Sequence, residues 1–179
     1  AFLSTGVAAA IIAMVVSTWV TKFYCKVKLF RYTQLMVAVL SVMIYFLVKP
    51  GDKVLAFLLY FMLSLVVDLH APVFWSAIAE TIDYGQVKTG KRVSGFAFGG
   101  ISVAQKAGMG LAGGMVGLLL NYFHYQPNQE QGALARQGIA LMLSVIPGFF
   151  HFLMGALMFK YRISDEYYST VKEELRVSA

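Results

Sequence analysis

The sequence predicts an all-α membrane protein with five transmembrane helices, and three observations lead to this fold class. First, 59% of the 179 residues are hydrophobic and only 13% are charged, whereas soluble domains carry about 25% charged residues. Second, the apolar residues form runs of the roughly 20 residues that a helix needs to cross about 30 Å of hydrocarbon. Third, short basic connections separate these runs, which is typical of membrane loops. The net charge of +6 therefore reflects membrane topology, and nucleic acid is not expected as a partner.

The predicted bundle covers residues 1–162, with spans at about residues 2–20, 32–48, 54–79, 93–122 and 135–159. No basic segment precedes the first span and no cleavage site follows it, so it differs from a signal peptide. Because it begins directly at Ala1, we expect the chain to be the C-terminal part of a longer membrane protein. The second span lies between two loops that contain lysine.

The third and fourth spans are longer than one bilayer crossing, so we expect them to tilt or to protrude. Pro72 removes a backbone hydrogen bond and is predicted to kink the third span. The fourth span contains the small-residue pairs Gly110–Gly114 and Gly113–Gly117, which permit close contact between helix backbones. A helix that moves against its neighbour and a static helix are equally compatible with this pattern. The fifth span is followed by a predicted tail at residues 163–179.

The distribution of lysine and arginine predicts the orientation. Eleven basic residues lie in the first loop, the third loop and the tail, and three lie in the connections on the other side. The side with the excess is expected to be cytoplasmic, which makes the C-terminus cytoplasmic and leaves Ala1 at the outer face. The single cysteine, Cys25, excludes an internal disulfide framework and a multi-cysteine zinc site.

Lys106 and Asp68 are charged residues predicted to lie at the same depth in the bilayer. Lys106 is 14 residues from Arg92, and Asp68 is 15 residues from Asp83, so both lie roughly 21–23 Å from the cytoplasmic boundary at about 1.5 Å per residue. A charge at such depth costs at least roughly 2.5–3.5 kcal/mol and faces a partner or a water-filled path. We expect these two side chains to pair. A fixed structural lock between helices, or contact of Asp68 with a segment outside this chain, are the alternatives.

Trp75 follows Asp68 by seven residues, so an unbroken helix would present both on nearly one face. An indole beside charged groups suits the stacking of a sugar ring, although tryptophan is also frequent at membrane interfaces. His70 and His151 lie inside spans without a second ligand at metal-binding spacing, so no metal site is predicted. A hydrogen-bonded structural role is favoured for them over proton relay. No nucleophile elbow, P-loop or catalytic carboxylate pair is present, so no enzyme activity is expected.

An acidic segment ends the third span and leads into a basic loop. The segment contains Glu80, Asp83, Tyr84 and Gly85, and the loop contains Lys88, Lys91 and Arg92. Acids that face basic residues across a cytoplasmic hairpin can form a gate that breaks when the helices move. The alternative is a solvated loop whose surface ion pairs contribute less than about 1 kcal/mol each.

Three segments together resemble the glycoside–pentoside–hexuronide:cation symporters, the melibiose permease-like family of the major facilitator superfamily. These segments are PVFWSAIAETIDYGQVKTGKR, the glycine-rich span with its central lysine, and YQPNQEQ. The resemblance covers essentially the whole chain and implies spans eight to twelve of a twelve-helix fold. It also implies import of a sugar or glycoside with Na⁺ or H⁺ by alternating access, without a cofactor, in the bacterial cytoplasmic membrane.

The resemblance further implies roles for individual residues. Lys106 corresponds to the family's lysine near the sugar and cation sites, Trp75 to an aromatic residue of the sugar cavity, and Ser102 to a hydroxyl residue that assists the sugar. Asp68 joins them as a substrate-binding candidate because of its depth. Three positions differ from the melibiose permease pattern, namely Gln86, Ala104 and Gln105. A hexuronide, a pentoside or another glycoside therefore fits as well as a galactoside, and the family's main cation-binding acids lie in its N-terminal half.

Part of a secondary sugar transporter is the preferred interpretation, with the lipid bilayer, the substrate and the missing N-terminal half as partners. A membrane subunit that transports nothing and packs against a partner through its glycine-rich helix is the alternative. A membrane-embedded enzyme is a third and less favoured class.

Overall fold

The computed structural model describes residues 2–178, and over this range the chain is helical with short connections. The helices are α1 (Phe2–Val20), α2 (Lys26–Leu47), α3 (Lys53–Leu69), α4 (Ala71–Thr89), α5 (Ser94–Tyr122), α6 (Ala133–Leu143), α7 (Val145–Leu157) and α8 (Asp165–Ser178). Four stretches of the described chain are long and apolar enough to cross a membrane, and Ser4–Val20 is a shorter apolar helix. The predicted all-α membrane fold is confirmed.

Two of the predicted spans are interrupted near a proline. The third span is divided at His70 into α3 and α4, and the fifth is divided at Ser144 into α6 and α7. Pro72 and Pro147 follow these breaks and cannot donate a backbone hydrogen bond to the residue four positions earlier. His70 N instead donates to the Asp68 carbonyl. The kink expected at Pro72 is therefore present as a break at His70, between α3 and α4.

The most extensive contact between two helices lies where α2 meets α7. Gln34 and Ser41 of α2 are 0% and 1% exposed. A Cβ atom added to Gly148 of α7 would lie 2.8 Å from Ser41 Cβ, and one added to Gly155 would lie 3.0 Å from a Leu35 methyl group. Glycine is thus required at these positions by close approach of the two helices. A second contact places the small side chains Ala9, Ala13 and Ser17 of α1 against the bundle, where they are fully buried.

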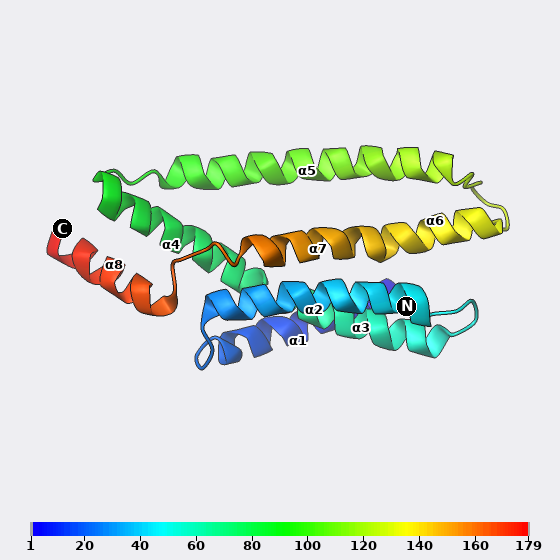
Figure 1. Cartoon of the computed structure of the whole chain (residues 1–179), viewed down its shortest axis with the longest axis horizontal. Coiled ribbons are helices and arrows are strands. Elements are labelled where there is room, and N and C mark those ends of the chain that lie inside the picture. The colour runs from blue at the N-terminus through cyan, green and yellow to red at the C-terminus, as the bar shows by residue number, and fades with distance from the viewer. Residues whose placement is uncertain (1, 179) are drawn as a thin grey trace.

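The glycine-rich helix α5 has no such contact within the described chain. It has no buried residue, and a Cβ added to Gly110, Gly113, Gly114 or Gly117 would meet no atom within 4 Å. It runs apart from α1, α2 and α3 (Figure 1) and packs mainly on α4 and α6, its neighbours in the sequence. Within the described chain, the close packing that glycine permits is therefore found on α1, α6 and α7 rather than on α5.

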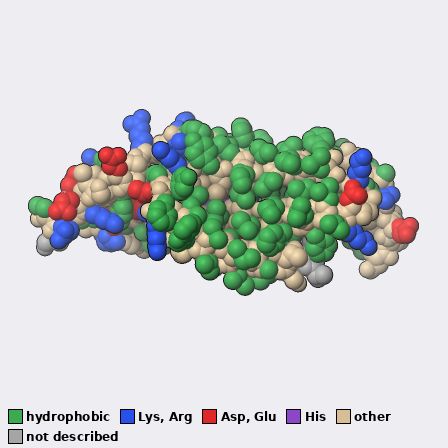
Figure 2. Space-filling model, turned by 90° about the horizontal axis from the view of Figure 1, so that it is seen from below, with side chains coloured by type: hydrophobic (Ala, Val, Ile, Leu, Met, Phe, Trp, Pro, Cys, Tyr) green, Lys and Arg blue, Asp and Glu red, His purple; other side chains and the backbone are tan. Residues whose placement is uncertain are grey.

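The surface shows how the bundle lies in a membrane. Hydrophobic side chains cover the middle of the molecule, and the charged side chains gather toward its two ends (Figure 2). One end is formed by residues 21–25, residues 90–93 and α8, and we call it the α8 end. Helix α8 lies beside α4 (Figure 1) with Val171 only 2% exposed. The α8 end carries the cluster described next.

Candidate functional site

Glu80 is the buried charge of the α8 end. Its side chain is 4% exposed, and its carboxylate forms an ion pair with the Lys26 ammonium at the beginning of α2. Ser76 Oγ donates to Glu80 Oε1 at 2.9 Å and accepts from Lys26 Nζ at 3.2 Å. The carboxylate is thus paired and hydrogen-bonded, as a buried charge requires. The sequence predicted that Glu80 would face the basic loop after α4. This prediction is wrong, because Glu80 pairs with Lys26 at the beginning of α2.

Asp83 is held from two sides. Arg92 Nη1 donates to Asp83 Oδ1 at 2.8 Å and to Gln86 Oε1 at 2.8 Å. The Tyr168 hydroxyl of α8 donates to Asp83 Oδ2 at 2.6 Å. Burial, together with the bond to Asp83, raises the pKa of Tyr168 above its usual range, so this hydroxyl remains a donor at neutral pH. Asp83 therefore connects α4 both to the loop that follows it and to α8.

Asp165 connects α8 to α2. Its Oδ2 accepts a hydrogen bond from the Lys26 backbone N–H at 2.9 Å, and its Oδ1 lies 3.6 Å from Lys26 Nζ. The first N–H groups of a helix have no partner within the helix and favour a negative charge. The Tyr168 ring centre lies 5.7 Å from the same Lys26 Nζ. Helix α8 therefore fastens the beginning of α2 to the C-terminal part of α4.

The other three members of the predicted gate have weaker contacts. The Tyr84 ring faces Tyr167 of α8, with centroids 6.0 Å apart, and lies 5.8 Å from Lys88 Nζ. Gly85 lines an apolar hollow of about 350 Å³ between α2, α4 and α5. Lys91 is exposed and forms no ion pair with a residue that the structure describes. A gating role for these residues stays a prediction.

The structure does not bring Asp68 and Lys106 together. Asp68 is half-buried on α3 and lines a hollow between α1 and α3, whereas Lys106 is exposed on α5. Neither residue has an ion pair among the described side chains. The expected pair is wrong here because α3 and α5 are not packed neighbours, and equal depth does not make two helices adjacent.

Trp75 lies close to the face of α5 that carries two other substrate-binding candidates, Ser102 and Lys106. Its ring stacks on Phe98, with centroids 6.4 Å apart and planes 22° apart, and it is 46% exposed. Ser102 Oγ donates to the Phe98 carbonyl at 2.8 Å, and Lys106 follows one turn later. Phe98, Ser102 and Lys106 are spaced by four residues and share one face of α5. Three of the four substrate-binding candidates therefore lie along one line, whereas the break at His70 separates Asp68 from Trp75.

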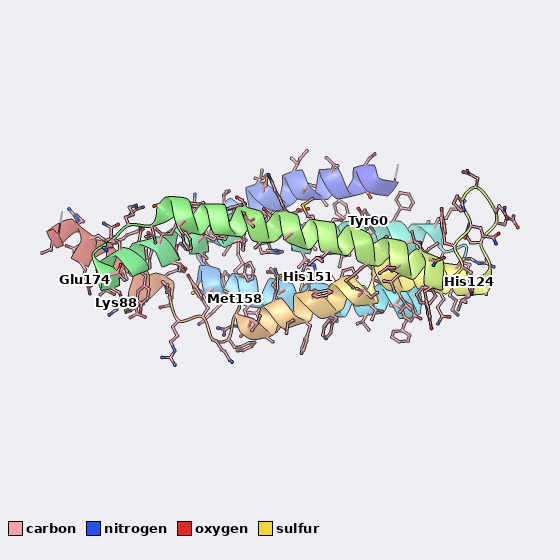
Figure 3. The ribbon with its side chains drawn as sticks, turned by 90° about the horizontal axis from the view of Figure 1, so that it is seen from above. Tyr60, Lys88, His124, His151, Met158 and Glu174 are labelled. Carbon is pink, nitrogen blue, oxygen red and sulfur yellow. The ribbon has the colours of Figure 1, made fainter. Side chains whose placement is uncertain are left out.

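His151 lies in the middle of the bundle (Figure 3). His151 Nδ1 and the oxygen of the buried Gln34 side chain are 2.6 Å apart. The His70 ring lies 6.4 Å from the His151 ring and 5.0 Å from Phe30. Within residues 2–178, no group of three His, Cys, Asp or Glu side chains could hold a metal ion. The hydrogen bond of His151 agrees with the structural role favoured for it.

Comparison with known proteins assigns the chain to a family. Residues 1–165 match the family model described as MFS/sugar transport protein. The chain belongs to this family. Its members are transport proteins of the major facilitator superfamily, so the chain is not an enzyme, and the resemblance to glycoside–pentoside–hexuronide:cation symporters is confirmed.

Three relatives illustrate the similarity. The chain is 28% identical over 177 residues to the inner membrane symporter YicJ of Escherichia coli K12, covering 98% of the chain and 38% of that protein. It is 30% identical over 147 residues to an uncharacterized 29.9 kDa protein of Pseudescherichia vulneris, covering 82% of the chain and 53% of that protein. It is 26% identical over 103 residues to the glucuronide carrier protein homolog of Escherichia coli K12, covering 58% and 22%. The chain thus spans about half or less of the length of these relatives.

Four residues that contact the candidate site residues were not predicted from the sequence. Lys26, Asp165 and Tyr168 complete the contacts of Glu80 and Asp83, and Gln34 completes those of His151. The available signals were an acidic and aromatic start of the tail, DEYY, and a glutamine within an apolar span. Neither signal names a partner, because the contacts join residues that are 54 to 139 positions apart.

Proposed function

We propose that the chain is the C-terminal portion of a secondary active transporter that imports a sugar or glycoside together with Na⁺ or H⁺ by alternating access. Membership of the MFS/sugar transport protein family supports this proposal. YicJ and the glucuronide carrier homolog are named as a symporter and a carrier, which favours a glycoside substrate class. The N-terminal portion of the transporter would be the partner of the exposed α5.

The observation that carries the proposal is the position of Lys106. It lies near the middle of a 29-residue helix, is exposed, and forms no ion pair with any residue in the described part of the chain. A lysine facing lipid at this depth would cost at least about 2.5–3.5 kcal/mol. Lys106 therefore faces a water-filled path or a polar surface of the remaining protein, and Ser102 and Trp75 border the same region. We assign these three residues, with Asp68, to substrate binding.

The α8 end is proposed to face the cytoplasm and to act as the gate. The excess of lysine and arginine lies on that side, and such an excess is typical of the cytoplasmic side of a membrane protein. In one state of the transport cycle, Glu80 would hold the cytoplasmic ends of α2 and α4 together through Lys26. Asp83 and Arg92 would hold α4 to the loop that follows it, and Tyr84, Gly85 and Lys91 lie in the same region. Ion pairs between separate elements are suited to this task because they break and reform as helices move.

Uptake by the full-length protein tests the proposal. The protein is reconstituted into proteoliposomes, and accumulation of labelled methyl glucoside, methyl xyloside and methyl glucuronide is measured under an imposed Na⁺ or H⁺ gradient. At least one glycoside is expected to accumulate, and Lys106→Ala is expected to abolish accumulation. Gly117→Ala, on the same helix, is the matched control and is expected to retain it. Failure of the wild-type protein to accumulate any glycoside under either gradient would reject the proposed function.

A further inference from the structure

One face of α3 carries three oxygen-bearing side chains at intervals of one helical turn. These are Tyr60, Ser64 and Asp68, and all three line a hollow of about 430 Å³ between α1 and α3. Residues spaced by four lie above one another on a helix. Tyr60 is labelled in Figure 3, on the α3 side that meets α1. Each of the three side chains is half-buried.

Helix α1 forms the opposite wall, and the residues that it contributes to the hollow have no side chain that can hydrogen-bond. It contributes Gly6, Val7 and Ala10 to the hollow. A Cβ added to Gly6 would lie 2.9 Å from the Tyr60 hydroxyl, so the glycine leaves room for that hydroxyl. The hydrogen-bonding groups of the hollow therefore come from α3 alone, and α1 supplies an apolar surface.

Asp68 gives this face its chemistry. It has no ion pair within the described residues, and it lies in the apolar part of the bundle. A carboxylate at this position marks a substrate or ion path, because contact with lipid is costly. The break at His70 places it at the C-terminal end of α3, next to the segment that turns toward Trp75.

The spacing of the oxygens indicates the kind of ligand. Eight residues separate Tyr60 from Asp68, which is about 12 Å along the helix axis. A hard cation gathers its oxygen ligands around one point, about six to eight at roughly 2.3–2.6 Å for Ca²⁺. Three oxygens spread over that length cannot surround a cation, but neighbouring members of the row, such as Ser64 and Asp68, lie about 6 Å apart along the axis and match the spread of hydroxyl groups on a sugar ring. The volume of the hollow lies within the roughly 300–1,000 Å³ typical of small-molecule sites.

We propose that Tyr60, Ser64 and Asp68 form a subsite for the hydroxyl groups of a glycoside, with the Asp68 carboxylate accepting hydrogen bonds from neighbouring hydroxyls. This subsite lies apart from the Trp75–Ser102–Lys106 line and extends the substrate site along α3. The apolar wall of α1 contacts the C–H surface of the sugar ring. The inference rests on the proposed function, since it assumes that the full-length protein carries a glycoside.

The subsite is tested in the full-length protein by combining substrates that lack one hydroxyl with protein variants that lack the group proposed to bind it. The probe is whichever methyl glycoside the wild-type protein accumulates, together with its monodeoxy analogues, and KM is measured in proteoliposomes. One of the monodeoxy analogues, which lacks the sugar hydroxyl bound by Asp68, is expected to have a KM about tenfold or more above that of the parent glycoside in the wild-type protein. Hydrogen bonds to charged groups contribute that much. Asp68→Asn is expected to raise the KM for the parent glycoside by a similar factor and to bind that deoxy analogue no more weakly than the parent.

Two further variants keep the result interpretable. Ser64→Ala is expected to raise KM about threefold to tenfold, and Ser41→Ala, which removes a hydroxyl at the α2–α7 contact, is expected to leave KM unchanged. If the wild-type protein transports a glycoside but Asp68→Asn and Ser64→Ala discriminate against every deoxy analogue as the wild type does, the subsite is wrong. A change in cation dependence alone would also overturn it. Absence of transport by the wild type would instead reject the proposed function on which the subsite rests.

Discussion

Replacing Lys26 with methionine tests whether the Glu80 ion pair holds the α8 end together. The substitution keeps the unbranched shape of the side chain, one atom shorter, and removes its charge. Glu80 would then remain as a buried carboxylate, 4% exposed, with Ser76 Oγ at 2.9 Å as its nearest donor. We expect the free energy of unfolding to fall, because an uncompensated buried charge is costly.

The size of the effect follows from the exposure of the two partners. Breaking a fully buried pair costs about 3–5 kcal/mol. Lys26 is 26% exposed and Ser76 still donates to the carboxylate, so we expect a smaller loss of about 2–3 kcal/mol. Glu80→Gln keeps the shape and leaves Lys26 with Asp165 at 3.6 Å, so about 1 kcal/mol is expected. The double variant should lose less than the sum, with a coupling energy of about 1–3 kcal/mol.

The assay is denaturant unfolding of the full-length protein in detergent micelles, analysed as a double-mutant cycle. Lys28→Met is the matched control, since Lys28 is exposed and has no ion pair with a described residue. A Lys26→Met variant that is no less stable than Lys28→Met, or a coupling energy near zero, would refute the reasoning.

Three other predictions concern α8 and the helix contacts. Tyr168→Phe removes the donor to Asp83 and is expected to accelerate proteolytic cleavage between α7 and α8. Tyr167 is 41% exposed, and Tyr167→Phe is expected to leave the cleavage rate unchanged. Equal cleavage rates for the two variants would count against the contact. Because burial raises the pKa of Tyr168, its neutral form is favoured in the folded state, and the stability that it contributes is complete below about pH 10 and declines above that value. The stability difference between wild type and Tyr168→Phe should therefore shrink as the pH is raised above 10, and a difference that grows would contradict the raised pKa. Gly148→Ala places a methyl group 2.8 Å from Ser41 Cβ and is expected to cost about 1–3 kcal/mol through overpacking, measured as a lower unfolding midpoint. The control is Gly132→Ala, whose added methyl group would meet no atom within 4 Å, and it should change the midpoint less.

The fold class was predictable because hydropathy and span length reflect one dominant energy, the transfer of apolar residues into hydrocarbon. The break before α4 was predictable from Pro72, because a missing N–H acts locally. The contact of Asp83 with Arg92 joins residues only nine positions apart, across the turn in which Gly90 adopts a positive φ of 70°. Such local features need no knowledge of how the helices are arranged.

The remaining contacts depend on helix order and rotation, which the sequence does not determine by itself. The depth of Asp68 and of Lys106 follows from a rise of about 1.5 Å per residue, but depth does not say which helices are neighbours. Glu80 pairs with Lys26 because α2 packs beside α4, and Asp165 reaches the same lysine because the chain returns along α7. The glycines of α5 likewise indicate a close contact without naming the helix that makes it.

The water accessibility of position 106 in the full-length protein tests the central claim most directly. Cys25 and any further cysteine of the full-length protein are replaced with serine and Lys106 with cysteine, and labelling by a membrane-impermeant thiol reagent is measured from each side of the membrane. We expect the cysteine at position 106 to be labelled from one side of the membrane. Labelling only by a lipid-soluble reagent would show that this helix face meets lipid and would contradict the claim that it borders the transport path.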